Sequence, residues 1–267
     1  MAAQRALADV KTAFVRDSAV LGATHRGGIL AEEMGLGKSI EVMALALLHP
    51  APEAWASRDA LKATLVISPP ALLGQWRAEL ASRCPNAAVV EWDAAEGLRA
   101  KRLRSADFVL CAYGDAASCA GSGATFWRCV LDEPHAALTA RARTCRVDAS
   151  PAVEACAHVR APNRWCVTGT PFGNGLFDVF GQLTFLGLVP RVLPVNYFRC
   201  ILSNNFPSAY NSTAEIVCSM LKPLVVRHSK SSERDGARLV SLPALRPRED
   251  VVVRAPLGAY AALAAEQ

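Results

Sequence analysis

The chemistry that this sequence could perform starts at residues 32–39, EEMGLGKS, between an apolar run and a helical stretch. Gly35 and Gly37 would let the backbone curl so that its N–H groups face a phosphate, and the following helix N-terminus adds partial positive charge. The Lys38 ammonium can then reach terminal phosphates, and the Ser39 hydroxyl can bind Mg²⁺. The segment predicts a nucleotide phosphate site; the alternative is an accidental glycine-rich turn.

A pair of acids follows an apolar run in WRCVLDEPH, residues 127–135. Asp132 would hold Mg²⁺ through water, and Glu133 would orient or deprotonate the water that attacks the terminal phosphate. Successive side chains of an extended chain point in opposite directions, so one acid can face the metal while the next faces the nucleophile. Such a pair alone is not specific, but together with the phosphate loop it predicts nucleotide hydrolysis.

Alternating apolar runs and helical stretches would position these residues. The apolar runs are typical of buried strands and occupy residues 27–31, 63–68, 87–92, 107–113, 127–132 and 164–169. Helical patterns occupy residues 38–48 (ended by Pro50), 72–82 and 176–188, whereas residues 51–60 and 114–124 have the composition of loops. This alternation predicts an α/β fold with a mainly parallel sheet and helices on both faces. Residues 136–160 give no clear pattern and could hold an insertion, and order weakens from residue 202.

Composition restricts the class of protein. With 267 residues, of which 52% are hydrophobic and 20% charged, the chain has room for one large domain with a buried core. No apolar run approaches the roughly 18 residues of a membrane helix. Five charged residues within residues 1–20 exclude a secretory signal and leave an organelle transit peptide as an alternative. Nine cysteines without a CxxC pair predict buried free thiols in a reducing compartment, and Trp76 and Trp165 are expected in the core.

Positive charge gathers near the end of the chain. Residues 222–254 contain eight Lys/Arg and four acids, so they supply +4 of the formal net charge of +5. A basic strip suits a polyanion such as nucleic acid, and it is equally typical of a solvated surface. The four basic residues within 99–104 are interpreted as the solvated face of a surface helix, with phosphate contact as the alternative.

Four segments resemble, in order, the motifs of the SWI/SNF-type superfamily 2 helicase-like ATPases: GGILAEEMGLGKS, LVISPPALLGQW, VLDEPH and RWCVTGTPFGN. The resemblance spans residues 26 to 254. It includes VVRHSK (225–230) and LPALRPREDVVV (242–253), which are similar to the family's segment that closes lobe one. The segment NRWCVTGTPFGNGLFDVFGQLTFLGLVP is most similar to the SHPRH-type branch, whose members couple such a motor to ubiquitin ligation. The resemblance implies a RecA-like P-loop NTPase lobe.

The resemblance also implies roles for individual residues. Those that would bind ATP are Gly35, Leu36, Gly37, Lys38, Ser39 and Gln4, the last as a remnant of the family's adenine-reading glutamine. Those that would hold Mg²⁺ are Ser39 and Asp132, and those that would serve hydrolysis are Lys38 and Glu133. Those that would contact the DNA tracking strand, or link the nucleotide state to the grip on DNA, are Ser68, Pro69, Gln75, Trp76, His135, Thr168, Gly169, Thr170 and Pro171.

Several positions depart from the family pattern. Glu32 replaces aspartate, and it also stands where the general pattern GxxxxGK[ST] has its first glycine; Ser39 replaces threonine and Gly173 replaces glutamine. These changes are mild. Pro134 replaces the alanine of the DEAH sequence, lacks a backbone N–H, and is expected to push Glu133 toward extended geometry. A displaced Glu133 would make the chain an interaction module that binds nucleotide without turnover.

The implied function is that of the ATP-binding lobe of a DNA-dependent ATPase and translocase, acting on double-stranded DNA or chromatin in the nucleus. The expected organisation is an N-terminal segment (1–25), the lobe (26–200), a lobe-closing basic segment (201–254) and a tail (255–267). The implied partners are a second RecA-like lobe in cis or in trans and, by branch resemblance only, ubiquitin-pathway proteins; a membrane is not expected.

Neither a second lobe nor a RING is recognised in this sequence, so we expect ATP binding with near-background turnover. An ordinary P-loop kinase or GTPase is a further alternative. The TGTP and ISPP motifs argue against it.

Overall fold

The computed structural model describes residues 26–55, 59–97, 101–136, 151–171, 177–188, 221–234 and 236–238. The chain forms two compact units, residues 1–229 and residues 230–267. In the second unit, the described residues include an antiparallel pair of two-residue strands, β8 (Glu233–Arg234) and β9 (Ala237–Arg238). The domain boundaries expected from the sequence stay predictions.

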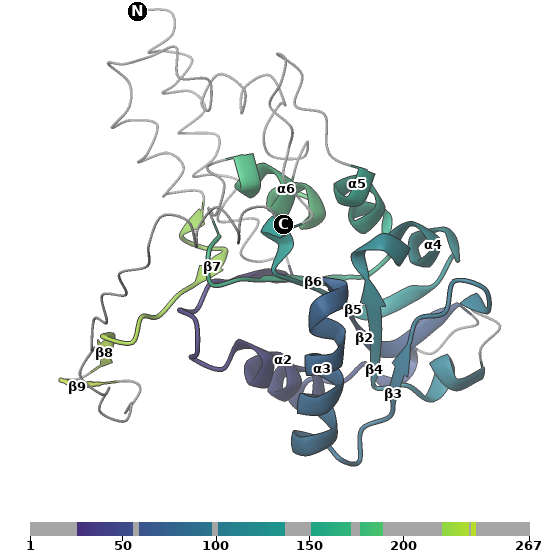
Figure 1. Cartoon of the computed structure of the whole chain (residues 1–267), viewed down its shortest axis with the longest axis horizontal. Coiled ribbons are helices and arrows are strands. Elements are labelled where there is room, and N and C mark those ends of the chain that lie inside the picture. The colour runs from purple at the N-terminus through teal and green to yellow at the C-terminus, as the bar shows by residue number, and fades with distance from the viewer. Residues whose placement is uncertain are drawn as a thin grey trace, which may run out of the picture. The chain divides into compact units, whose positions relative to one another are not determined.

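A seven-stranded, all-parallel sheet forms the centre of the first unit, in the order β3-β4-β2-β5-β6-β1-β7 (Figure 1). Its strands are β1 (Gly27–Leu30), β2 (Ala60–Ser68), β3 (Val89–Glu91), β4 (Phe108–Ala112), β5 (Thr125–Asp132), β6 (Asn163–Val167) and β7 (Val225–Val226). The six apolar runs correspond to the first six strands, so the predicted parallel sheet is confirmed. The sequence analysis did not predict β7, which has only two residues and pairs with β1.

Helices cover both faces of this sheet, as predicted (Figure 1). One face carries α2 (Lys38–Leu48) and α3 (Pro70–Arg83). The other carries α4 (Ala116–Gly121), α5 (Pro151–His158) and α6 (Phe177–Phe185). The predicted helix at 38–48 has the observed bounds, because Pro50 follows closely and cannot continue a helix. Among the described residues, no helix combines the length and the apolar character that a membrane span requires.

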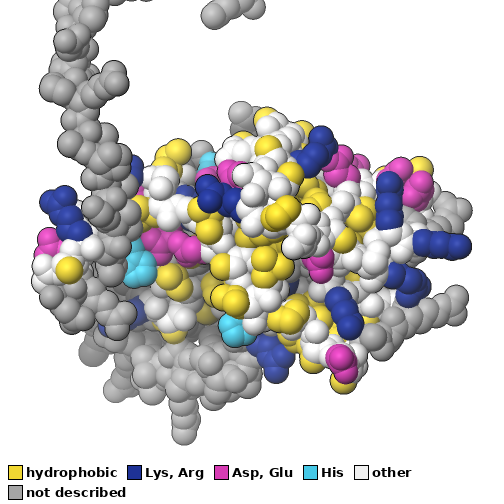
Figure 2. All heavy atoms as spheres, turned by 90° about the horizontal axis from the view of Figure 1, so that it is seen from below, with side chains coloured by type: hydrophobic (Ala, Val, Ile, Leu, Met, Phe, Trp, Pro, Cys, Tyr) yellow, Lys and Arg dark blue, Asp and Glu magenta, His cyan; other side chains and the backbone are white. Residues whose placement is uncertain are grey.

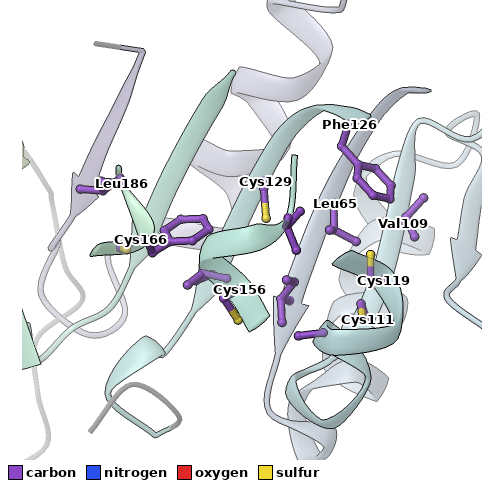
Figure 3. Packing of buried hydrophobic residues seen from close by; sticks show 14 of the residues in the cluster. Leu65, Val109, Cys111, Cys119, Phe126, Cys129, Cys156, Cys166 and Leu186 are labelled. Atoms are coloured by element: carbon purple, nitrogen blue, oxygen red, sulfur yellow. The ribbon is translucent and has the colours of Figure 1, made fainter. Parts of the chain in front are cut away.

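Alternating strand residues feed two hydrophobic cores, one under each layer of helices. The core under α4, α5 and α6 includes Leu65, Val109, Cys111, Cys119, Phe126, Cys129, Cys156 and Cys166 (Figure 3). The core under α2 and α3 includes Val42, Met43, Val66, Trp76, Leu80, Leu110 and Val130. The six cysteines within the described residues are buried free thiols, as predicted.

Two glycines let β1 lie close to its neighbours. A Cβ added to Gly27 would lie 1.8 Å from the carbonyl oxygen of Arg164 in β6, and one added to Gly28 would lie 2.4 Å from the carbonyl oxygen of Leu224. Atoms cannot approach so closely, so these positions exclude any larger residue. The glycine pair therefore fixes the strand that leads into the phosphate loop.

Three expectations about connecting segments are corrected or completed by the structure. Residues 114–124 were expected to form a loop, but they contain α4, because alanine favours helix and because Ala116 and Cys119 bury their side chains in the core. Within 136–160, residues 151–158 form α5, and residues 137–150 lie outside the described residues. The basic residues expected on a surface helix at 99–104 lie partly in a short 3₁₀ helix, Lys101–Ser105, whose three basic side chains are exposed.

Candidate nucleotide-binding site

A cavity of about 570 Å³ opens at the carboxyl edge of the sheet, between the phosphate loop and α3. Its lining comprises Met34, Gly35, Gly37, Lys38, Ser39, Ile40, Leu72, Gln75, Trp76, Glu79, Arg83, Asp132 and Glu133. The structure thus brings together the phosphate loop and the acid pair, which lie far apart in the sequence. Ligands of open parallel sheets bind at this edge, where the strands end.

The phosphate loop is shaped by two glycines with left-handed backbone. Gly35 has φ 87° and Gly37 has φ 94°, values that other residues adopt only with strain. Gly37 is the N-cap of α2 and no side chain of the described residues caps that helix, so the N–H groups of its first turn are left for a ligand. The Lys38 ammonium donates to the carbonyl of Glu32 at 3.1 Å and lines the cavity. This geometry suits an anion such as a nucleotide phosphate.

Asp132 is the last residue of β5, is 9% exposed, and is held at three points. Its Oδ2 accepts hydrogen bonds from the Trp76 indole Nε1 at 2.7 Å and from Ser68 Oγ at 3.1 Å. Its backbone carbonyl accepts one from the Tyr113 hydroxyl at 3.0 Å. Burial raises the pKa of Asp132, and the Trp76 hydrogen bond opposes that shift by favouring the ionised carboxylate.

Glu133 does not have the extended backbone that was expected from its position before Pro134. Its φ is 46°, in the left-handed region, and its N–H donates to the carbonyl of Val167 at 2.8 Å. The chain leaves β5 and enters a 3₁₀ helix, Pro134–Ala136, within this single residue, so the turn has to be made there. Pro134 is buried and suits the first position of that helix because its φ is preset.

The Glu133 carboxylate is directed toward the segment that follows β6. Its Oε2 accepts a hydrogen bond from Thr168 Oγ1 at 2.8 Å, and His135 Nδ1 lies 3.2 Å from the same oxygen. Thr168 is fully buried, and its own N–H donates to the carbonyl of Leu30 in β1 at 3.0 Å. The two neighbouring acids therefore point to different partners, although Glu133 lacks the extended backbone on which that expectation was based.

The TGTP segment packs onto the phosphate loop. A Cβ added to Gly169 would lie 2.7 Å from Met34 Cγ and 3.4 Å from Lys38 Nζ. The N–H of Thr170 donates to Thr168 Oγ1 at 3.1 Å. In α6, Gln182 Nε2 donates to the carbonyl of Pro171 at 2.9 Å and so ties the segment to the opposite helical layer.

The residues assigned to DNA contact by resemblance occupy two kinds of position. Ser68 and Trp76 are buried, at 0% and 3% exposure, and both contact Asp132. Pro69 is the N-cap of α3, and Gln75 lines the cavity with its amide donating to Glu79. DNA contact stays a prediction for these residues. Gln4 lies outside the described residues.

Several residues at the site were missed by the sequence analysis. His228, to which no partner was assigned, contacts buried Glu32: its Nδ1 lies 2.7 Å from one carboxylate oxygen, and its backbone N–H donates to the other at 3.1 Å. Arg227 donates to the carbonyl of Ala31 at 2.7 Å. The two residues of each pair are 196 positions apart, so no local pattern could predict these contacts. Only the resemblance of VVRHSK to a lobe-closing segment indicated that residues 225–230 lie near the phosphate loop. Tyr113 and Gln182 gave no sign of their roles in the sequence.

The residues present fit a magnesium ion bound together with a nucleotide. Ser39 and Asp132 both line the cavity, and Asp132 Oδ1 accepts no hydrogen bond from the part of the chain that the structure describes. That same part contains no cluster of three or more His, Cys, Asp or Glu side chains that could hold a metal alone. This is the donor set that Mg²⁺ uses with phosphates, since it is held by one or two protein oxygens, water and the substrate.

Comparisons with known proteins identify the family of this chain. The model of the SNF2-related domain family matches residues 12–242. DNA repair protein rad8 of Schizosaccharomyces pombe is 30% identical over 248 residues, which cover 82% of this chain and 21% of the relative. DNA repair protein rad5 of Emericella nidulans is 32% identical over 259 residues, covering 81% and 20%. The chain thus spans about a fifth of the length of these relatives, whose names do not single out the SHPRH-type branch.

A solved structure gives the same fold. The Sulfolobus solfataricus SWI2/SNF2 ATPase core in complex with dsDNA has a TM-score of 0.61 at 21% identity, over 82% of this chain and 44% of that chain. The family match covers most of the sequence and contains the phosphate loop, the acid pair and the TGTP segment. The chain therefore belongs to the SNF2-related domain family of ATPases.

Proposed function

We propose that this chain is the ATP-binding lobe of a DNA-dependent ATPase and translocase that acts on double-stranded DNA. The observation that carries the proposal is one cavity that is lined by Lys38 and Ser39, from the start of α2, and by Asp132 and Glu133, from the end of β5 and the residue after it. A phosphate loop, a metal-binding acid and a second acid in one cavity are the parts that nucleotide hydrolysis requires.

Each side chain has a distinct task in this proposal. The N–H groups at the start of α2 would bind phosphate oxygens, and Lys38 would leave the Glu32 carbonyl to contact the terminal phosphates. Ser39 and Asp132 would hold Mg²⁺, which when bound neutralises charge that builds up on the phosphates. Glu133 would orient the attacking water, and Thr168 fixes the direction of its carboxylate.

Calorimetric titration with Mg·ATP tests nucleotide binding. We expect saturable binding by the wild type and a loss of about 100-fold in affinity for Lys38→Ala, since this side chain contributes a charge-assisted hydrogen bond to the terminal phosphates. Lys101→Ala is the matched control, because that exposed lysine lies in the 3₁₀ helix after β3 and does not line the cavity. Equal affinities for wild type and Lys38→Ala would contradict the proposal.

DNA and further protein partners belong to the same proposal. The relatives named above are DNA repair proteins, and the structural neighbour was solved with dsDNA. We propose that a second RecA-like lobe, in cis or in trans, completes the ATPase, because this chain covers 44% of that neighbour. A nuclear role in DNA repair or chromatin follows from the relatives, and ubiquitin-pathway partners would follow only from the SHPRH-type resemblance.

The DNA part of the proposal has its own test. On the face that carries α2 and α3, hydrophobic side chains extend across the middle and Lys/Arg side chains are spread around them (Figure 2). Contacts with the phosphate backbone alone would give weak binding that falls steeply with salt and does not depend on sequence. Fluorescence anisotropy of labelled duplexes in a salt series measures this. Tight binding to one sequence that persists at high salt would contradict it.

A second candidate function is a nucleotide-dependent interaction module without turnover. The observation that favours it is the left-handed backbone of Glu133 before a buried proline, with the carboxylate already bonded to Thr168. In this case Mg·ATP would bind while hydrolysis stays at background, even with a second lobe fused to the chain. Single-turnover hydrolysis by such a fusion, with protein in excess over labelled ATP, separates the two functions.

A further inference from the structure

The Asp132 carboxylate is held asymmetrically. Both of its side-chain hydrogen bonds, from Trp76 Nε1 and from Ser68 Oγ, end on the same oxygen, Oδ2. The other oxygen, Oδ1, accepts none from the described residues, and the side chain reaches the cavity. A carboxylate has two equivalent oxygens, so this arrangement assigns one to the protein and leaves the other for a ligand.

The two donors belong to one rigid strand–helix unit. Ser68 is the last residue of β2 and Trp76 lies in α3, which begins at Pro70. Pro69 (φ −53°, ψ 140°) and Pro70 form the corner between the two elements, and proline rings restrict both backbones. The donors therefore face Asp132 as a preformed pair.

Packing fixes the orientation of the indole ring. Trp76 is 3% exposed and packs in the core under α2 and α3, with residues such as Leu80 and Val130. A ring held by packing delivers its N–H in one direction, and the 2.7 Å contact with Oδ2 is the shorter of the two side-chain bonds to Asp132. A phenylalanine would fill most of the same space without donating a hydrogen bond.

We propose that Trp76 is a positioning residue for magnesium: its N–H, with Ser68, binds Oδ2 of Asp132 and so turns Oδ1 toward the metal that accompanies the nucleotide. The inference rests on the proposed function, since it concerns the same cavity. It gives Trp76 a task on the nucleotide side of the site, whereas its sequence segment resembles one that contacts DNA. Partners that orient a metal-binding carboxylate have large effects on metal affinity.

The test measures how nucleotide binding depends on magnesium. A fluorescent ATP analogue is titrated with the wild-type chain at a series of Mg²⁺ concentrations and in EDTA, and the same series is run with Trp76→Phe. We expect Trp76→Phe to raise the Mg²⁺ concentration at half-maximal binding by about 10- to 100-fold. Affinity in EDTA should stay at the wild-type value, because the proposed role of Trp76 is to position Asp132 and not to contact the phosphates.

Trp92→Phe is the matched control. Trp92 is also buried, at 8% exposure, and its indole Nε1 donates to a serine hydroxyl, Ser118 Oγ, at 2.8 Å. It packs against Phe126 in the core under the other helical layer. Loss of this N–H should leave both the magnesium midpoint and the affinity in EDTA unchanged. Ser68→Ala, which removes the second donor and little volume, should shift the midpoint in the same direction as Trp76→Phe, and it keeps the test open if Trp76→Phe does not fold.

The outcomes separate this inference from the proposed function. Equal magnesium midpoints for wild type, folded Trp76→Phe and Ser68→Ala would overturn the positioning role while leaving nucleotide binding intact. An equal loss in EDTA and in Mg²⁺ would also overturn it, because that result indicates general damage to the cavity. A loss of DNA affinity with an unchanged midpoint would place Trp76 on the DNA side instead. Absence of magnesium-dependent binding by the wild type would overturn the proposed function, and this inference with it.

Discussion

Asp132 and Glu133 are neighbours in the sequence but lie in two different kinds of structure. Asp132 is the last residue of β5, pairs with Val167 of β6, and receives three hydrogen bonds from groups on or next to β2, α3 and β4. Glu133 is a single left-handed residue between a strand and a 3₁₀ helix. Its carboxylate is held by the segment after β6.

This difference in surroundings gives one site two acids: the Asp132 carboxylate is held firmly, and the Glu133 carboxylate is held less firmly. The donors to the Asp132 carboxylate, Ser68 at the end of β2 and Trp76 in α3, are both buried, so packed regular elements hold this carboxylate. The Glu133 carboxylate is held by Thr168, in the segment after β6, and by His135, in the 3₁₀ helix. A left-handed backbone at a residue other than glycine costs about 1–3 kcal/mol and persists only where its surroundings hold it. Substitutions of Ser68 and Trp76, the residues that hold Asp132, should therefore change magnesium binding. Substitutions of Glu133 and of its partner Thr168 should change the rate of hydrolysis.

Glu133→Gln gives the largest expected effect. The amide keeps the shape of the side chain but cannot accept a proton, so hydrolysis should fall by about 10²–10⁴-fold. Affinity for Mg·ATP should stay near the wild-type value, since Asp132 and the phosphate loop are unchanged. Single-turnover hydrolysis by the chain fused to a second RecA-like lobe, and calorimetric titration, measure the two quantities; the hydrolysis rates of the other variants refer to the same fusion. A rate that equals the wild-type rate would show that Glu133 has no part in hydrolysis and would favour the module without turnover.

Thr168→Val tests whether the position of the Glu133 carboxylate matters for hydrolysis, because it keeps the acid and removes one of its partners. Valine keeps the shape of threonine but removes the hydroxyl that donates to the Glu133 carboxylate at 2.8 Å. A hydrogen bond to a charged group contributes about 1.5–3 kcal/mol, so hydrolysis should slow by about 10- to 100-fold. The magnesium midpoint should not move, which is the opposite of the result expected for Ser68→Ala. Parallel shifts of midpoint and rate in both variants would remove the distinction between the two acids.

Gly169→Ala tests whether the TGTP segment, which holds the Glu133 carboxylate through Thr168, also affects nucleotide binding. The added methyl would press on Met34 and approach Lys38 Nζ, so the phosphate loop has to shift. Because Met34 is 65% exposed and can move, we expect a loss in affinity of only about 3- to 10-fold. Gly74→Ala in α3 is the control: its Cβ would meet nothing within 4 Å, and alanine should stabilise the helix by about 0.5–1 kcal/mol. Equal affinities for both variants would show that this contact does not matter.

The same contrast explains what could be predicted from the sequence. The first six strands and the helix α2 follow from apolar patterns. The motif residues, Lys38 and Ser39 at the start of α2 and Asp132 and Glu133 at the end of β5, lie in one cavity. These positions depend on regular elements, whose side-chain directions are set by a short repeat. That part of the fold and site could be predicted because local sequence determines it.

Features that depend on one turn or on a distant contact could not be predicted. The left-handed φ of Glu133 results from the need to end β5 and start a 3₁₀ helix at once, and the rule for residues before proline points the other way. The His228–Glu32 contact joins residues 196 positions apart, so no local pattern contains it. The helix α4 was missed because glycine and serine in its segment suggested a loop, while burial of Ala116 favoured a helix.

Pro134→Ala is expected to have the smallest effect on stability and on the rate of hydrolysis. It tests whether Pro134 holds the Glu133 carboxylate away from the attacking water. Two consequences of the substitution oppose each other. Alanine relieves the steric restriction that proline places on Glu133, but it also frees the backbone of the unfolded chain, which costs about 0.4–1 kcal/mol. The bonds that hold Glu133, from its N–H to Val167 and from Thr168 to its carboxylate, do not involve Pro134. Stability should therefore change by less than about 1 kcal/mol.

The rate of single-turnover hydrolysis by Pro134→Ala should likewise remain within about 3-fold of the wild-type rate, because a carboxylate held by the same partners keeps the same position. Pro52→Ala is the matched control, since Pro52 precedes another 3₁₀ helix, Glu53–Trp55, and does not line the cavity. A rise of about tenfold or more in Pro134→Ala alone would mean that proline holds the carboxylate away from the attacking water, at a cost near 1.4 kcal/mol in the barrier. The left-handed turn at Glu133 would then slow hydrolysis by misplacing its carboxylate, while Asp132 would keep its position for metal binding.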